Sequence, residues 1–420
     1  MCSLVIAAAL VAAISLAPAA QAAVQLRITC YSDGNECPIT KQLAARFTQQ
    51  NPDIQIEIDE VPYSAILQSL PVQLASNNGP DVARVTLFGS VQRYMLDLRP
   101  YLKDADQWEA NFGPELDWMR SGPNDHGIYG LMTQLTVTSP FVDKTLFEQA
   151  NVPLPGPKAT WDDWAAAVAK VAKATNTPFG MAWDRSGHRF AGPAISYGAK
   201  YLNTDGKPAV IDDGFRAMAS RWVKWNQDGT ADKSIWAAQA SGYGDAFADF
   251  QNAKIVLYLS GSWQLNRMVK QIGDSFDWAV VPNPCGPATC TGMPGGAAFV
   301  AFKETRHPAE VARFLDWMEQ PAIYTEFMAK TLNIPASAAV RKAGVNYDLP
   351  PAGKAAMQAL LQNADSLAPL AYKLQGYHYN ATIFNVTADR LSQVIAGDMT
   401  LDQAYQRITE DINQALAAAK

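Results

Sequence analysis

The stretch FTQQNPDIQIEIDEVPYSAILQSLPVQLASNNGPDV, from Phe47 to Val82, contains a strand–helix–strand pattern that decides the fold class. Within it, Ile54–Ile58 places apolar residues at every other position, which predicts a strand. The segment 64–76 has helical spacing and predicts a helix, although Pro71 lies inside it. The turn-forming sequence NNGPD precedes another apolar run, which predicts a further strand.

Strand and helix patterns alternate on both sides of this stretch. Val24–Cys30 predicts a first strand and 41–50 a first helix. This β-α-β-α order predicts an α/β fold in which a mostly parallel sheet is flanked by helices. Later helices are predicted to start at N-terminal capping or proline signals, namely Thr160 with Asp163, Pro308, and Thr400 with Gln403.

The composition is that of a globular protein with one large domain or two. The chain has 420 residues, of which 48% are hydrophobic and 18% charged, so there is enough apolar content to fill sizeable cores. The formal net charge is -6, and no stretch clusters Lys and Arg. We therefore expect no nucleic-acid partner, because phosphate binding requires clustered positive charge.

The N-terminal residues predict export. The run LVIAAALVAAISLAPAAQAA, from Leu4 to Ala23, is uncharged and ends in a small-x-small pattern. A membrane anchor is the alternative, but a cleavage pattern closing an Ala-rich run favours a signal peptide over residues 1–23. No Lys or Arg precedes the apolar run, so the true translation start is left open. We expect a soluble periplasmic protein, cleaved near Ala22 or Ala23.

The cysteines predict two local disulfide bonds. Cys2 leaves with the predicted leader, and the other four form two close pairs, Cys30 with Cys37 and Cys285 with Cys290. In an oxidising compartment such pairs indicate disulfides that make their loops rigid. Neither pair has the C-x-x-C spacing of a metal or redox site.

No catalytic or metal-binding motif is present in the sequence. The four histidines form no H-E-x-x-H pattern, and G-x-S-x-G, Walker A and G-x-G-x-x-G motifs are absent. We therefore expect no catalytic residue, no metal and no cofactor. The eleven Trp and fifteen Tyr are a different signal, because aromatic rings also line ligand pockets. Most have helical spacing typical of a core, whereas Trp183, Trp263, Tyr377 and Tyr379 stand in loop-like contexts and are pocket candidates.

These motifs together resemble a known family. Phe47–Val82, with its strand after N-P and its later A-S-x-x-x-P-D-V-like end, is similar to the extracellular solute-binding proteins of carbohydrate ABC importers, the maltose-binding-protein-like group. YGLMTQLTVTSPFVDKTLFEQANV with TWDDW, then NAKIVLYLSGSW, GGAAFVAFKETRHPAEVARFLDWM, NIPA and IAGDMTLDQAYQ, resemble later segments of that family in the same order. The resemblance covers essentially the whole mature chain.

The resemblance implies a type II periplasmic-binding-protein-like fold with two α/β lobes and a ligand held between them. The lobes would be joined by crossing segments near 134–139, 294–297 and 335–337. The implied N-terminal lobe comprises residues 24–134 plus 297–336, and the C-terminal lobe 138–294 plus 337–420.

The resemblance also implies a set of ligand-contact residues, each carried over from a matching segment. They are Ser32, Asp33, Thr86, Gln134, Thr136, Asp184, His188, Arg189, Trp263, Gly295, Gly296 and Tyr379. The disulfide-bounded loop after the first predicted strand would thus be a contact loop, and a stapled surface turn is the alternative.

Two departures from the family pattern bear on the ligand. Val142-Asp143 replaces the usual Tyr-Asn, and RVTLFG lacks the acidic and tryptophan residues of oligosaccharide-binding members. A small ligand is therefore expected in place of a long maltodextrin. Arg185 with Arg189 gives the hypothesis that it carries an anionic group, and a solvated surface charge is the alternative for these arginines.

The expected function is that of a monomeric, non-enzymatic receptor. It would capture a sugar, polyol or small glycoside and deliver it to the permease of an ABC importer. The alternative ligands are a glycerophosphodiester, a sugar acid or a sulfonated sugar. A more remote alternative is an exported carbohydrate-active hydrolase. The identity of the ligand is beyond the sequence, because specificity depends on a few loop residues.

Overall fold

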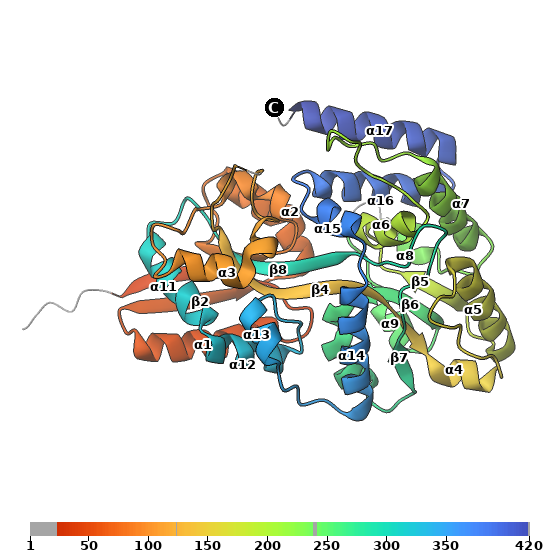
Figure 1. Ribbon diagram of the computed structural model, residues 1–420, viewed down its shortest axis with the longest axis horizontal. Helices are drawn as coiled ribbons and strands as arrows, with labels where there is room; N and C mark the ends of the chain where they lie inside the picture. Colours follow the sequence, from red (N-terminus) through yellow and green to blue (C-terminus); the bar gives the residue numbers. More distant parts are fainter. Residues whose placement is uncertain (1–22, 123, 238–241, 419–420) are drawn as a thin grey trace, which may run out of the picture.

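A computed structural model describes residues 23–122, 124–237 and 242–418. The predicted signal peptide therefore lies almost entirely outside the described residues, and its cleavage near Ala22 or Ala23 stays a prediction. The described chain forms an eight-stranded sheet in the order β2-β1-β3-β8-β4-β6-β5, with β7 paired to β4 (Figure 1). The strands are β1 (Val24–Cys30), β2 (Ile54–Glu60), β3 (Val82–Val85), β4 (Gly130–Asp143), β5 (Phe179–Trp183), β6 (Ile255–Gly261), β7 (Trp278–Val280) and β8 (Pro294–Ala301).

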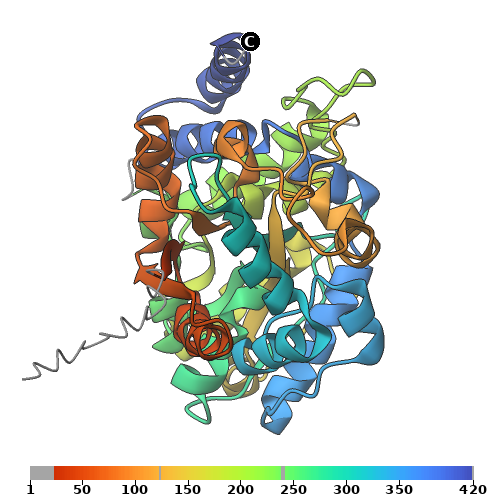
Figure 2. The same cartoon turned by 90° about the vertical axis from the view of Figure 1, so that its left-hand side faces the viewer.

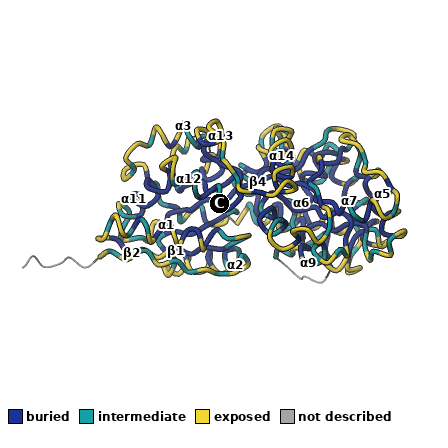
Figure 3. Tube along the Cα trace, turned by 90° about the horizontal axis from the view of Figure 1, so that it is seen from below, coloured by how far each residue is buried: buried dark blue, intermediate teal, exposed yellow. Residues whose placement is uncertain are grey.

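The sheet is parallel at its two ends and antiparallel in the middle. β1 pairs in parallel with β2 and β3, and β5 pairs in parallel with β6. β8 is antiparallel to both β3 and β4, and β4 is antiparallel to β6. The 14-residue β4 pairs with β8 over Gly130–Val137 and with β6 over Thr138–Val142. It thus runs through both halves of the molecule, and it lies at the waist between them in Figure 3.

We call the half built on β1, β2, β3 and β8 the first lobe and the half built on β5, β6 and β7 the second lobe. The first-lobe core combines strand residues such as Leu26 and Ile28 with Phe47 and Phe314 from helices, all of which are buried. Figure 2 looks onto this lobe from its free end, where helices cover the sheet. They are α1 (Glu36–Gln50), α2 (Tyr63–Ala75), α3 (Ala105–Leu116), α11 (Pro308–Glu319), α12 (Pro321–Thr331) and α13 (Ala338–Ala343).

The second lobe is packed around tryptophans. Trp183 of β5 stacks on Trp222 with the ring centroids 3.9 Å apart and the planes 8° from parallel. Trp183 is therefore a core residue and does not line a pocket. The helices are α4 (Lys144–Gln149), α5 (Trp161–Thr175), α6 (Gly187–Ser196), α7 (Asp213–Gln227), α8 (Ser234–Ala237), α9 (Phe247–Gln251), α10 (Leu265–Arg267), α14 (Pro351–Asp365), α15 (Pro369–Gln375), α16 (Asn380–Ala396) and α17 (Leu401–Ala418).

Several local predictions are confirmed. Thr160 and Asp163 form the reciprocal capping box of α5, and Thr400 and Gln403 exchange the same two bonds before α17. Pro308 occupies the first position of α11. α2 spans almost the predicted residues and keeps Pro71 within it, whereas α1 starts five residues before the predicted helix, at Glu36.

Both predicted disulfides, Cys30–Cys37 and Cys285–Cys290, are present. No helix among the described residues is long and apolar enough to cross a membrane. The same residues contain no group of three or more His, Cys, Asp or Glu side chains arranged to hold a metal ion.

The predicted lobe boundaries, 24–134 plus 297–336 and 138–294 plus 337–420, stay a prediction. β4 and β8 do run between the lobes, as two of the expected crossing segments do. α13 falls in the predicted C-terminal lobe but packs against α3 and α12 of the first lobe.

Candidate ligand-binding site between the lobes

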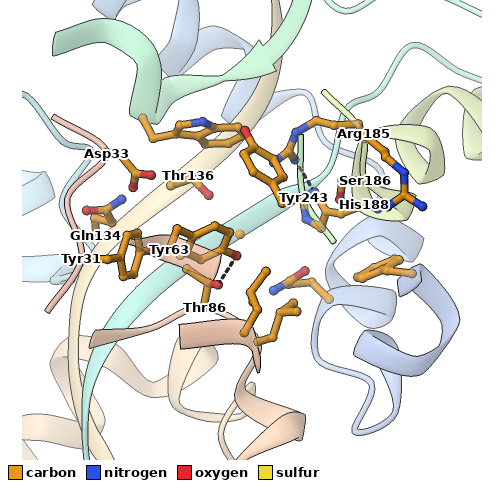
Figure 4. Close-up of a pocket in the computed structure, with 18 residues that line it drawn as sticks. Tyr31, Asp33, Tyr63, Thr86, Gln134, Thr136, Arg185, Ser186, His188 and Tyr243 are labelled. Carbon is orange, nitrogen blue, oxygen red and sulfur yellow. Dashed lines mark hydrogen bonds between the residues drawn. The ribbon is translucent and has the colours of Figure 1, made fainter. Parts of the chain in front are cut away.

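A pocket lies between the two lobes at the waist of the molecule. The space open to the centres of water molecules in it is about 120 Å³. In Figure 4, Asp33, Gln134, Tyr31 and Thr86 lie on one side, and Arg185 with His188 on the other. The lining residues are Tyr31, Asp33, Tyr63, Leu67, Thr86, Leu87, Gln134, Thr136, Arg185, Ser186, His188, Arg189, Tyr243, Trp263, Gly295, Gly296, Gln375 and Phe384.

Arg84 organises the first-lobe wall from behind. Its side chain is fully buried, and it donates to the backbone oxygen of Tyr31 and to Oε1 of Gln134, each at 2.9 Å. The same guanidinium lies 3.4 Å from Asp33 and 3.7 Å from Glu36. β3 thereby holds the loop after β1 and the crossing strand β4 in one arrangement.

Asp33 is the carboxylate that this wall presents to the pocket. Burial raises the pKa of Asp33 to about 7, because the cost of desolvation and the nearby charge of Glu36 outweigh the attraction of Arg84. The loop that carries Asp33 is fixed at both ends by the Cys30–Cys37 disulfide. The loop predicted to be rigid thus lies at the pocket, and its contact with a ligand stays a prediction.

Two tyrosines complete the first-lobe wall. Tyr31 and Tyr63 lie with their ring centroids 4.8 Å apart, and the hydroxyl of Tyr63 shares a 2.8 Å hydrogen bond with Thr86. Tyr63 also meets Tyr243 of the second lobe edge to face at 5.6 Å. A further contact between the lobes joins Nδ2 of Asn266 to Oδ1 of Asn35 at 3.1 Å. The two lobes are thus closed onto each other around the pocket.

The second-lobe wall is built on Arg189. Its guanidinium lies over the ring of Trp263, 4.1 Å from the centroid. One nitrogen donates to Thr138 at 3.2 Å and to Nδ1 of His188 at 2.6 Å. Nε2 of His188 in turn donates to the backbone oxygen of Pro294 at 2.8 Å, which requires the neutral ring with its proton on Nε2. Burial, reinforced by the positive charge of Arg189, lowers the pKa of His188 to about 3.

Asp184 lies behind Arg189 as its counter-charge. The two side chains are 3.7 Å apart, and Asp184 is fully buried. Its carboxylate accepts hydrogen bonds from Tyr243, Tyr258 and Ser260 at 2.7, 2.6 and 2.5 Å. Burial raises the pKa of this carboxyl group against the opposing charge of Arg189. The acceptor capacity of Asp184 is used within the wall, so it does not reach the pocket.

Arg185 also reaches the pocket, but its polar groups are occupied. It donates to Asp389 at 2.7 Å and to Ser392 at 2.9 Å, and it also bonds to the backbone oxygen of Gly242. These contacts link Gly242 to α16.

Most of the predicted contact residues come together in this one pocket. Those that line it are Asp33, Thr86, Gln134, Thr136, His188, Arg189, Trp263, Gly295 and Gly296. The others do not: Ser32 bonds to Glu60 and to the backbone of Cys37, Asp184 is the buried counter-charge, and Tyr379 precedes α16 with its ring near Tyr377. Tyr377 itself lines a second, more open hollow beside His378 and Asp117.

Several lining residues are missing from the set that the sequence suggests, including Tyr31, Tyr63, Tyr243 and Gln375. Tyr31 directly precedes the predicted Ser32-Asp33 pair, so its position in the contact loop is a usable signal. Tyr63 opens α2 and resembles an ordinary helix-start residue. Tyr243 and Gln375 reach the pocket only through packing of distant segments.

Comparison with known proteins decides the family. A family profile described as "Bacterial extracellular solute-binding protein" matches residues 34–324. The chain belongs to this family. The Arabinooligosaccharide-binding protein of Bacillus subtilis is 25% identical over 291 residues, which are 65% of this chain and 64% of the relative.

Solved structures agree on the fold of this solute-binding protein. An ABC substrate-binding protein from Listeria monocytogenes in complex with cycloalternan superposes with a TM-score of 0.79 at 18% identity, covering 94% of this chain and 99% of that one. An ABC transporter solute-binding protein from Thermotoga lettingae bound with alpha-D-tagatose gives 0.76 at 15% identity, covering 93% and 99%. The two-lobe α/β fold class predicted from the sequence is therefore confirmed.

Proposed function

We propose that this solute-binding protein captures a small carbohydrate between its lobes and delivers it to the permease of an ABC importer. The observation that carries this proposal is the pocket itself, which combines aromatic faces with hydrogen-bonding groups from both lobes. Aromatic rings suit the C–H face of a sugar, and carboxylate, amide and hydroxyl groups suit its hydroxyls. The names of the relatives support the class of ligand, since they refer to an arabinooligosaccharide, cycloalternan and tagatose.

The size of the pocket favours a small ligand. A space of about 120 Å³ open to the centres of water molecules, enclosed between the lobes, suits one or a few sugar rings. A long maltodextrin would require the lobes to stay further apart.

The charges favour a ligand without a negative group. The charge of Arg189 is balanced by Asp184 at 3.7 Å, and that of Arg185 by Asp389 at 2.7 Å. An anion would therefore have to displace existing bonds or remain incompletely paired. The anionic alternatives, a sugar acid, a sulfonated sugar or a glycerophosphodiester, are the second arm of the test.

A hydrolytic role has little support from the pocket. Glycoside hydrolysis uses two carboxyl groups flanking the scissile bond. Among the described residues that line the pocket, Asp33 is the only carboxylic acid. We propose that the protein acts by binding alone, as an exported monomer whose lobes, divided as the sequence predicts except that α13 belongs to the first lobe, open and close on β4 and β8.

The first experiment is a thermal-shift screen of the mature protein against sugars, polyols, sugar acids, sulfonated sugars and glycerophosphodiesters, followed by calorimetry on each hit. A ligand at one hundred times its Kd adds about 2.7 kcal/mol to the free energy of unfolding. A neutral sugar that binds, together with compaction in small-angle scattering, is the expected result. The proposal would be contradicted if a folded protein showed no thermal shift with any sugar, or if it hydrolysed chromogenic glycosides.

Trp263→Ala tests whether the ligand occupies this pocket. It should abolish the shift, because Trp263 lines the pocket. Trp317→Ala is the matched control, since it removes a tryptophan from the first-lobe core, away from the pocket. Trp317→Ala should lower the melting temperature but keep the ligand-induced shift.

A further inference from the structure

Asp33 is the least satisfied charged group in the pocket. Its hydrogen-bond partner among the described residues is Arg84, at a long 3.4 Å. Its side chain is 23% exposed, whereas that of Arg189 is 9% exposed and lies flat on Trp263. A carboxylate has room for about four hydrogen bonds, so Asp33 keeps acceptor capacity directed at the pocket.

The charge around Asp33 is also unbalanced. Arg84 is shared with Glu36, whose carboxylate accepts from the backbone nitrogens of Asp33 and Gly34 at 2.9 and 3.0 Å and from Asn333 at 3.3 Å. One guanidinium thus faces two carboxyl groups, and the first-lobe wall carries a surplus negative charge when Asp33 is ionised.

The second-lobe wall carries no matching positive surplus, because its two arginines are each paired with an aspartate. Instead it adds another unused acceptor. Gln375 lines the pocket, is 4% exposed, and its Oε1 has no hydrogen-bond donor among the described residues. Nε of Arg189 is, among the residues that the structure describes, an unpaired donor in the same wall, so the surplus that calls for a donor on the ligand lies at Asp33.

The rings beside Asp33 suit a cation. Tyr31 already holds the guanidinium of Arg84 over its face, 4.1 Å from the centroid. Tyr63 lies 4.8 Å from Tyr31 and lines the pocket itself. The negative face of an aromatic ring attracts ammonium groups, and this attraction strengthens when water is excluded.

We propose that the ligand is an amino sugar, whose ammonium group is bound by Asp33 beside Tyr63. An ammonium brings three donors and one positive charge, which satisfies Asp33 and cancels the surplus of the Asp33–Glu36–Arg84 cluster. This assignment rests on the proposed function and specifies its substrate class. It also reverses the sign of the ligand charge that Arg189 suggests in the sequence.

Calorimetry on matched sugars tests the assignment. The probes are glucose, glucosamine and N-acetylglucosamine, with the galactose and mannose series beside them, each near neutral pH and at low salt. In at least one series the amine should bind on the order of tenfold more tightly than its parent sugar. The N-acetyl derivative, which fills the same position without a charge, should not share this gain.

Two variants locate the effect. Asp33→Asn keeps the shape and removes the charge, so the amine should lose its advantage over the parent sugar; the readout is the ratio of the two dissociation constants, not the affinity of either sugar. Glu60→Gln removes an equal charge next to Ser32, outside the pocket, and should leave the preference unchanged. Circular dichroism and thermal melts confirm that each variant folds.

The outcomes separate the two proposals. Binding of neutral sugars with no amine preference, or a preference that survives Asp33→Asn, overturns the amino-sugar assignment and leaves the proposed function in place. Silence of every probe in every series, with a folded protein, overturns both.

Discussion

The two walls of the pocket each contain an arginine beside an aspartate, but they differ in how fully the aspartate is hydrogen-bonded and its charge balanced. On the second lobe, Asp184 is fully buried, accepts three side-chain hydrogen bonds and balances Arg189. On the first lobe, Asp33 is partly exposed and shares the single charge of Arg84 with Glu36. Each wall uses an arginine and an aspartate, but only in the second wall is one arginine matched by one carboxylate.

This difference gives the two walls separate roles in folding and in ligand binding. A complete buried network fixes geometry, because every partner is needed and removing one leaves a buried charge unpaired. In an incomplete network a ligand can provide the missing hydrogen bonds and balancing charge, and these contacts add to its binding free energy. We therefore expect changes in the second wall to act mainly on folding, and changes in the first wall to act mainly on affinity.

The largest expected effect comes from the same substitution made on each wall. Asp184→Asn should lower the free energy of unfolding by about 3–5 kcal/mol, because it leaves Arg189 uncompensated in the interior. Asp33→Asn should change it by less than about 1 kcal/mol, since the lost attraction to Arg84 is offset by relief of repulsion with Glu36. Urea denaturation of both variants measures the difference.

Asp277→Ala is the control for this pair, because Asp277 is 73% exposed and lies 4.0 Å from Lys144. It should have almost no effect on stability. Equal losses for Asp184→Asn and Asp33→Asn would show that the two walls do not differ as described.

The next prediction compares two loops that are each closed by a disulfide, the contact loop at the pocket and a loop remote from it. The disulfides Cys30–Cys37 and Cys285–Cys290 span 7 and 5 positions in sequence. Replacing either pair by serine should cost roughly 2 kcal/mol of stability, from the loop entropy of the unfolded chain. Only the Cys30/Cys37 variant should also weaken binding, because that loop carries Asp33. Calorimetry on both double variants decides, and equal affinities would remove the loop from the site.

A comparable effect, about 2 kcal/mol at pH 5, depends on pH and belongs to the second wall. The pKa of His188 falls from 6.5 to about 3 on folding. Below pH 6.5 the unfolded chain binds a proton that the folded protein does not accept until about pH 3. The free energy of unfolding therefore falls as the pH falls through this window, by about 1.4 kcal/mol per pH unit, or about 2 kcal/mol at pH 5.

His188→Gln isolates this contribution. Other groups titrate in the same range, and the pKa of Asp143, raised by burial to about 6, acts in the opposite direction. The difference between the original protein and the variant cancels these groups and should shrink on acidification. A difference that stays constant from pH 7 to pH 5 would mean that His188 takes up a proton in the folded state.

The sequence predicts features that depend on residues a few positions apart, but not contacts between residues that are distant in the chain. The Ile54–Ile58 strand, the Thr160–Asp163 cap and both disulfides depend on residues a few positions apart, and all are confirmed. The lobes follow from the order of elements together with the family resemblance. The walls do not, because they depend on which distant side chains meet.

Asp184 illustrates the limit. It follows a predicted strand and resembles a ligand contact, yet Tyr258 and Ser260 of the neighbouring strand β6 cover it with donors. The pairing of β5 with β6 joins segments more than seventy positions apart. No local pattern marks Tyr243 as a third donor, or shows that Arg84 would be buried beneath the contact loop.

The smallest effect concerns the contact that joins the two walls. Asn266 donates to Asn35 across the lobes at 3.1 Å, beside the loop that holds Asp33. This hydrogen bond belongs to the closed form, in which the two walls meet. Asn266→Ala should therefore weaken ligand binding by about 1 kcal/mol, near fivefold in Kd. Asn413→Ala, on α17 away from the pocket, is the control. Stopped-flow fluorescence should place the loss in faster ligand release, because the open form never makes this bond. A loss confined to the association rate would mean instead that Asn266 guides the ligand into the open site and that closure gains nothing from the contact.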